Sequence, residues 1–236
     1  MNNEKLIVAL DVPDLKEAEA LVKLLSPVVG VFKVGKELFT AEGPRVVEMV
    51  HAHKAQVFLD LKFHDIPNTV AQACRAAVRH KIFMLNIHAF GGKTMVSKAV
   101  EAVREEAQKL NQSLPILIGV TVLTSLEDKD LSEVGVLNPV SKQVELLARL
   151  AKDAGLSGVV ASPKEIDLVR KACGKDFMIV TPGVRPEWAA VGDQKRVMTP
   201  REAIQKGADF IVVGRPITQD KDPKAATEKI LKEING

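Results

Sequence analysis

Short hydrophobic runs recur along the whole chain, and they are nearly continuous rather than alternating with polar residues. Such runs are typical of strands in a parallel sheet that is covered on both faces. We predict eight strands, over residues 6–12, 29–34, 56–62, 83–89, 116–123, 158–161, 177–181 and 210–214. Parallel neighbours need crossover connections, so helices are expected between the runs.

The segments between these runs have the spacing of helices with one hydrophobic face. Two clear examples are residues 70–78 and 96–110, in which hydrophobic side chains recur three or four positions apart. Candidate helix starts have a cap residue followed by an acidic residue or a proline, and they lie at residues 14–17, 138–139, 162–165, 199–202 and 222–223.

Eight strand and helix units predict an α/β fold, a single (β/α)8 TIM barrel with parallel strands that spans residues 1–236 as one domain. The 236 residues, of which 46% are hydrophobic, are enough to build one large core. An open, doubly wound sheet is the weaker alternative.

Composition and charge exclude several classes of protein. The longest hydrophobic stretches are far shorter than the ~20 residues needed to cross a bilayer, and the polar start at Met1–Lys5 lacks a secretory signal, so we expect a cytoplasmic protein. A net charge of +3 with interleaved signs, together with 8 Phe, 1 Trp and no Tyr, argues against nucleic-acid binding. Cys74 and Cys173 are the only cysteines, which excludes a disulfide framework and a cysteine-rich zinc site.

Charged residues lie at the ends of predicted strands, where barrels of this type carry their active sites. Asp11, Lys33, Asp60 and Lys62 fall within or just after hydrophobic runs, where an unpaired charge is costly, so we expect them to meet at the barrel mouth. Asp60 and Lys62 are two positions apart and should project to one face of their strand, with Asp65 in the following turn. A structural ion-pair network is the alternative interpretation, and the second lysine, Lys33, weakens it.

A long loop without helical spacing, residues 184–198, follows the seventh predicted strand. Loops after strands seven and eight of such barrels often bind phosphate, and long loops in compact domains are usually functional or disordered. Gly183 and Gly214 permit a ligand to approach the backbone, while Arg185 and Arg215 offer guanidinium groups for a bidentate grip. We therefore expect a phosphate group to bind here.

Several segments together resemble the bacterial orotidine 5'-phosphate decarboxylases. They are Leu-Asp at 10–11, Phe-Lys-Val-Gly at 32–35, Asp-x-Lys-x-x-Asp-Ile-Pro-Asn-Thr at 60–69, Thr-Pro-Gly-Val-Arg at 181–185 and Val-Gly-Arg-Pro-Ile at 213–217. The Asp-x-Lys-x-x-Asp motif alone is shared with sugar-phosphate decarboxylases and synthases, but the combination is more specific. The resemblance implies a carboxy-lyase that converts orotidine 5'-phosphate into uridine 5'-phosphate in de novo pyrimidine biosynthesis, with no metal or organic cofactor.

The resemblance also implies roles for individual residues. The implied catalytic residues are Lys33, Asp60, Lys62 and Asp65, with Lys62 as the proton donor. The implied substrate ligands are Asp11, Lys33 and Thr69 at the ribose, Asp60 at the substrate carboxylate, Thr124 and Gln194 at the pyrimidine, and Arg185, Gly214 and Arg215 at the phosphate. Arg185 and Gln194 would belong to a closing lid. A homodimer is implied as well, in which Asp65 reaches into the neighbouring subunit's site.

Two other functions stay open at this point. One is a magnesium-dependent sugar-phosphate decarboxylase or synthase of the same fold group, and the other is a non-catalytic protein that binds a phosphate ligand. The adjacent Thr124 and Ser125, with Gln194, favour a substrate that carries a base, and a buried charge array would serve no purpose in simple binding. His64 and His88 have no metal-ligand spacing, and their roles are left open.

Overall fold

The computed structural model describes residues 5–189 and 198–236 of the chain. Eight parallel strands form a closed barrel in sequence order: β1 (Leu6–Ala9), β2 (Val31–Gly35), β3 (Gln56–Phe63), β4 (Met84–His88), β5 (Ile116–Val120), β6 (Gly158–Val160), β7 (Met178–Thr181) and β8 (Phe210–Val213). The pairing of β1 with β8, in which Ile7 lies opposite Val212, closes the ring. The predicted barrel is therefore confirmed, and the open sheet is excluded.

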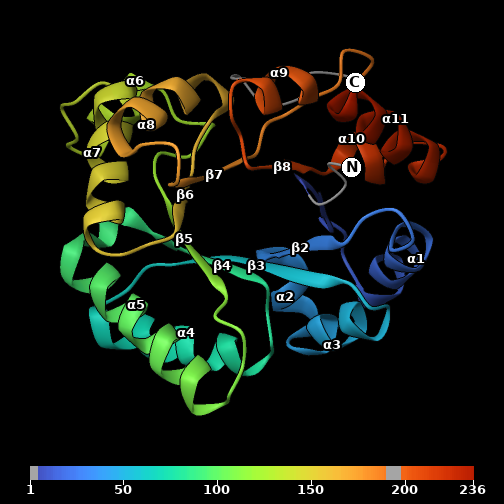
Figure 1. The fold of residues 1–236 in the computed structure, drawn as a ribbon, viewed down its shortest axis with the longest axis horizontal. Helices are drawn as coiled ribbons and strands as arrows, with labels where there is room; N and C mark the ends of the chain where they lie inside the picture. The colour runs from blue at the N-terminus through green and yellow to red at the C-terminus, as the bar shows by residue number, and fades with distance from the viewer. Residues whose placement is uncertain (1–4, 190–197) are drawn as a thin grey trace.

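Helices form an outer ring around the strands (Figure 1). In chain order they are α1 (Leu15–Leu25), α2 (Lys36–Glu42), α3 (Arg45–Ala52), α4 (Pro67–Arg79), η2 (Ala89–Gly91), α5 (Gly92–Lys109), α6 (Asp128–Glu133), α7 (Val140–Asp153), η3 (Pro163–Glu165), α8 (Ile166–Cys173), α9 (Pro200–Gln205), α10 (Arg215–Thr218) and α11 (Pro223–Asn235). Within the described residues, no helix is both long and hydrophobic enough to span a membrane.

The predicted helix starts have a physical basis in side-chain caps. Asp14 Oδ1 accepts a hydrogen bond from the backbone N–H of Glu17 at 2.9 Å, and Thr199 forms a reciprocal capping box with Glu202 at the start of α9. The prediction at residues 138–139 needs a correction, because Pro139 rather than Asn138 is the cap residue of α7. The Ser162 box begins the short η3, and α8 follows it.

Two strands end three residues earlier than their hydrophobic runs predict. β1 ends at Ala9 and β5 at Val120, whereas the runs extend to Val12 and Leu123. After β5 the chain leaves the sheet, and its next hydrophobic side chains line a cavity at the barrel mouth. A hydrophobic run therefore marks burial but does not show where strand pairing stops.

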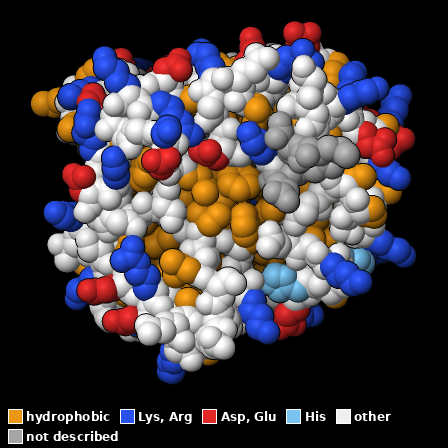
Figure 2. All heavy atoms as spheres, viewed as in Figure 1, with side chains coloured by type: hydrophobic (Ala, Val, Ile, Leu, Met, Phe, Trp, Pro, Cys, Tyr) orange, Lys and Arg blue, Asp and Glu red, His pale blue; other side chains and the backbone are white. Residues whose placement is uncertain are grey.

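The strands bury side chains on both faces, as the continuous runs predict. The barrel interior holds one hydrophobic cluster, made of Ile7, Ala9, Val31, Phe58, Met84, Ile118, Val180 and Val212. A larger cluster fills the layer between the barrel and the helices, and Cys74 and Cys173 are buried in it as free thiols. Figure 2 shows hydrophobic side chains gathered at the centre of one face of the molecule, inside a rim of mixed charge.

Candidate active site

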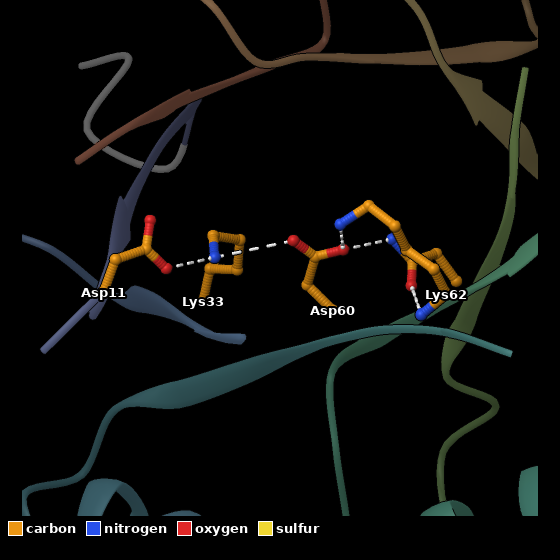
Figure 3. Close-up of polar contacts among 5 residues, drawn as sticks. Asp11, Lys33, Asp60 and Lys62 are labelled. Atoms are coloured by element: carbon orange, nitrogen blue, oxygen red, sulfur yellow. Dashed lines mark hydrogen bonds and ion pairs between the residues drawn. The ribbon is translucent and has the colours of Figure 1, made fainter. Parts of the chain in front are cut away.

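A row of four charged side chains crosses the mouth of the barrel from β1 to β3 (Figure 3). Lys33 Nζ lies 2.8 Å from Asp11 Oδ1 and 3.5 Å from Asp60 Oδ2, and Lys62 Nζ lies 2.6 Å from Asp60 Oδ1. Lys33 and Asp60 are each only 8% exposed. The predicted meeting of these four charges is confirmed, and each buried charge has an opposite partner within the row.

Glycine makes room for the first half of this row. A Cβ atom placed on Gly35, at the end of β2, would lie 2.9 Å from Lys33 Nζ and 3.2 Å from Asp11 Oδ1. Any larger residue there would push against the two groups that form the ion pair. Gly35 therefore allows the Lys33 ammonium group to lie directly over the strand end.

The second half of the row depends on an irregular segment of β3. The pairing of β3 with β4 shifts register between Leu59 and Phe63, and the backbone of Lys62 adopts a left-handed conformation with φ of 54°. Regular strand alternation is therefore not what brings Lys62 beside Asp60, although the sequence prediction relied on it. A bulge re-aims the side chain instead, as bulges commonly do next to active sites.

Asn86 belongs to the same cluster, although it is not among the site residues predicted from the sequence. Its side-chain amide donates to Asp60 Oδ1 at 2.6 Å, and its carbonyl oxygen accepts from the backbone N–H of Lys62 at 2.8 Å. Asn86 is 1% exposed in the middle of β4. The sequence signal that could have identified it is a polar residue between the hydrophobic residues of a buried strand, because such a residue needs hydrogen-bond partners.

The electrostatics of the row favour an ionised Asp60. Burial by itself raises the pKa of Asp60, but the Lys33 and Lys62 ammonium groups and the hydrogen bonds from Lys62 and Asn86 outweigh it and lower the pKa below its usual value. Asp60 is therefore a carboxylate at neutral pH, held between two cations.

Two adjoining cavities meet at this charged row and share Lys33, Asp60 and Lys62 as walls. The first, about 210 Å³, is the apolar lobe, lined also by Phe58, Val122, Leu123, Val160 and Val180 and by the predicted Thr124 and Ser125. The second, about 350 Å³, is the basic lobe, lined also by Asp11, Lys36, Gly183, Arg185, Gly214 and Arg215. The cleft can thus hold an elongated ligand with one largely apolar end and one anionic end.

Three predicted residues lie outside this arrangement. Asp65 and Thr69 are exposed, in the loop before α4 and in its first turn, and neither lines a lobe in the described chain. Asp65 Oδ1 accepts from the backbone N–H of its neighbour Ile66 at 2.6 Å, and no ion pair joins Asp65 to Lys62 of the same chain. Gln194 falls outside the described residues, so its predicted position is not tested.

A pair of histidines lies beside the charged row. The ring centroids of His64 and His88 are 5.4 Å apart. Burial lowers the pKa of His88 to about 4, and nearby His64, Lys36 and Lys62 contribute in the same direction. His88 is therefore neutral at neutral pH and adds no positive charge to the site.

Comparison with known proteins decides the family. The family model described as "Orotidine 5'-phosphate decarboxylase / HUMPS family" matches residues 4–230. The chain belongs to this family. Orotidine 5'-phosphate decarboxylase of Moorella thermoacetica is 58% identical over 232 residues, covering 98% of this chain and 92% of that protein. The enzyme of the same name from Syntrophotalea carbinolica is 56% identical, covering 98% of this chain and 95% of that protein.

A solved structure agrees with the family in both fold and length. The crystal structure of orotidine 5'-phosphate decarboxylase from Lactobacillus acidophilus is 38% identical and superimposes with a TM-score of 0.86. The match covers 99% of this chain and 100% of that one. The resemblance inferred from short motifs therefore extends over nearly the whole chain.

Proposed function

We propose that this protein is a carboxy-lyase that converts orotidine 5'-phosphate into uridine 5'-phosphate and carbon dioxide, in pyrimidine biosynthesis. The observation that carries the proposal is the position of the Lys33, Asp60 and Lys62 row between an apolar lobe and a basic lobe of one cleft. A nucleotide has a planar base at one end and a phosphate at the other. Orotidine 5'-phosphate carries its carboxylate on the ring carbon beside the ribose, so binding across both lobes would place that carboxylate over the charged row. The names of the similar proteins support the same substrate.

Loss of carbon dioxide from the pyrimidine leaves an electron pair on a ring carbon that no carbonyl group is positioned to delocalise. The enzyme must therefore stabilise this charge directly and then supply a proton. Lys62 is our proposed donor, because its ammonium group is 2.6 Å from the Asp60 carboxylate and lines both lobes. The carbon–carbon bond breaks, its electron pair stays on the ring, and the Lys62 proton forms the new carbon–hydrogen bond.

Asp60 would act on the group that leaves. Its low pKa keeps it ionised, so the substrate carboxylate would bind next to a negative charge that its departure as neutral carbon dioxide relieves. A unit charge pair at ~4 Å contributes about 4 kcal/mol at an effective dielectric constant of 20. Enzymes lower slow barriers by about 20 kcal/mol, so this pair cannot account for catalysis alone.

The basic lobe would supply the remaining lowering of the activation barrier, through binding of the remote phosphate. We assign the phosphate to Arg215 and Gly214, with Arg185 beside them, and the ribose to Asp11 and Lys33. Binding energy gained there can hold the base over the charged row in the transition state. Thr124 is assigned to the pyrimidine, and the assignments of Gln194 to the base and of a closing lid remain predictions.

A homodimer is part of the proposal, with Asp65 and Thr69 contributed to the neighbouring subunit's site. Both residues are exposed in this chain, and Ile66 between them is 67% exposed, which is high for a large hydrophobic side chain. A two-fold interface over this loop would bury Ile66 and make the exchange of residues reciprocal. The cytoplasmic location expected from the sequence also remains a prediction.

One assay separates this proposal from its rivals. The absorbance of orotidine 5'-phosphate should fall with the purified protein in excess chelator, and Lys62→Ala protein should leave it unchanged. Activity that is lost in chelator and restored by magnesium would favour the metal-dependent sugar-phosphate enzyme. Binding of uridine 5'-phosphate without any turnover of the orotidine nucleotide would favour a non-catalytic binding protein.

A further inference from the structure

Asn86 occupies a place where a hydrophobic residue would be expected. It lies between Leu85 and Ile87 on β4, and its side chain points into the barrel toward β3. At 1% exposure, its amide has lost access to water, which costs about 1–3 kcal/mol if its hydrogen bonds are not replaced. A leucine of similar size would avoid this cost, so the amide must contribute something that leucine cannot.

The two partners of Asn86 fix the direction of its amide. The Asp60 carboxylate can only accept hydrogen bonds and the Lys62 backbone N–H can only donate one. The amide nitrogen must therefore face Asp60, at 2.6 Å, and the amide oxygen must face Lys62, at 2.8 Å. A single side chain from β4 thus holds the two residues of β3 whose charged groups touch.

Both held residues need external support. Lys62 has a left-handed backbone with φ of 54°, a conformation that costs about 1 kcal/mol or more for a residue other than glycine. The β3–β4 register is interrupted between Leu59 and Phe63, where regular ladder bonds do not set the backbone position. The bond from the Lys62 N–H to Asn86 lies within this interruption.

We propose that Asn86 is a positioning residue for decarboxylation, which fixes the Asp60 carboxylate and the Lys62 backbone so that the Lys62 ammonium group stays over the reacting carbon. This inference rests on the proposed function. Asn86 also lines the apolar lobe, but in this role it acts through its two neighbours rather than on the substrate. Because the Asp60 oxygen that it contacts is also the oxygen that Lys62 Nζ contacts, its removal affects both ends of the reacting pair.

Asn86→Leu tests the assignment, because leucine fills a similar volume and offers no hydrogen bond. We expect kcat for orotidine 5'-phosphate to fall about ten- to a hundredfold, the value of a hydrogen bond to a charged group, while KM changes less than threefold. Relative to wild type, kcat of Asn86→Leu should fall further as the pH is lowered, since Asp60 loses a hydrogen bond that favours its ionised form. Asn86→Ala should lose less, because a water molecule can replace the amide.

Thr227→Val is the matched control. Thr227 is 0% exposed in α11, and its hydroxyl donates to the carbonyl of Pro223 at 2.7 Å, outside both lobes. This variant should lower thermal stability and leave kcat and its pH profile unchanged, which measures the effect of losing a buried hydrogen bond alone. Thermal unfolding and uridine 5'-phosphate binding confirm that each variant is folded.

The outcomes separate the two proposals. If wild-type protein does not decarboxylate orotidine 5'-phosphate, the proposed function fails. If wild-type protein is active and folded Asn86→Leu keeps kcat and pH profile within twofold of it, the role of Asn86 fails. The role fails equally if Asn86→Leu raises KM while kcat is unchanged, because that result would place Asn86 in substrate binding.

Discussion

Lys62 Nζ lies 2.6 Å from Asp60 Oδ1 across a β-bulge, although only Leu61 separates the two residues in the chain. The contact depends on the left-handed backbone of Lys62, which turns its side chain back over the barrel mouth. Lys33 approaches the other oxygen of Asp60 from β2 at 3.5 Å. The carboxylate is therefore held between two cations from different strands, and changes to each member should have distinct effects.

Lys62→Ala should lower kcat at least a hundredfold, and we expect a nearly complete loss, because it removes the proposed proton donor. Uridine 5'-phosphate affinity should fall much less than the rate. Lys81→Ala is a suitable control, because Lys81 has the same φ of 54° and lies outside both lobes. A Lys62→Ala enzyme that retained a tenth of the wild-type rate would rule out the assigned role.

Asp60→Asn should lower the free energy of unfolding by about 3 kcal/mol, because it leaves the buried Lys33 and the half-buried Lys62 without a shared counter-charge. Asp11→Asn is the comparison, since the Asp11 side chain is 54% exposed and its pair should contribute less than about 1 kcal/mol. Urea unfolding at neutral pH measures both. Equal losses would show that burial of Asp60 is not what makes its charge important.

Arg215→Ala should impair the nucleotide substrate far more than an orotidine substrate without phosphate. The proposed reason is that Arg215 binds the phosphate in the basic lobe and that part of this binding energy is used in the transition state. Steady-state kcat/KM for both substrates measures the difference. Arg45→Ala, an exposed arginine paired with Glu42, should alter neither. Equal losses of kcat/KM for the two substrates would show that Arg215 does not bind the phosphate.

His88 should make stability depend on pH in the weakly acidic range. Its pKa is lowered to about 4 in the folded protein, against about 6.5 in an unfolded chain, so the unfolded state binds the proton more readily. Stability is then fully present above about pH 6.5 and declines as the pH falls toward 4. His88→Gln should flatten this decline in urea unfolding, whereas Thr227→Val, which changes no titratable group and lies outside both lobes, should not. Parallel curves for wild type and His88→Gln would contradict the expectation.

The barrel could be predicted because eight separate hydrophobic runs each indicated a strand. An error at one strand end therefore did not change the number of strands. The sequence also predicted that the charges at Asp11, Lys33, Asp60 and Lys62 would meet, because unpaired charges at the ends of buried strands are too costly. Both predictions rest on burial, which sequence patterns report well.

Local geometry was harder to foresee. The bulge between Leu59 and Phe63 leaves no hydrophobic signature, and a left-handed lysine such as Lys62 cannot be distinguished from an extended one by residue type. Asn86 was passed over because its partners come from a neighbouring strand, and one of them is a backbone group. Pairing between strands must be known before such a contact can be expected.

Asp65 gives the sharpest test of assembly, because it makes no ion pair with Lys62 of its own chain. If Asp65 serves the neighbouring subunit, Lys62→Ala and Asp65→Asn homodimers should both be inactive. A mixed dimer would contain one site with both changes and one site with both native residues. With free exchange at equal amounts, half the dimers are mixed and half of their sites intact, so about a quarter of wild-type activity should return.

The recovered activity identifies the chain that Asp65 serves, provided that exchange is measured directly. Differently tagged subunits should co-purify after mixing, and each variant should unfold at a temperature near that of wild type. Lys62→Ala mixed with wild type under the same conditions calibrates the activity of dimers with one native Lys62. If subunits exchange and the Lys62→Ala and Asp65→Asn mixture stays inactive, Asp65 acts within its own chain. The loop before α4 would then have to move toward its own barrel mouth when substrate binds.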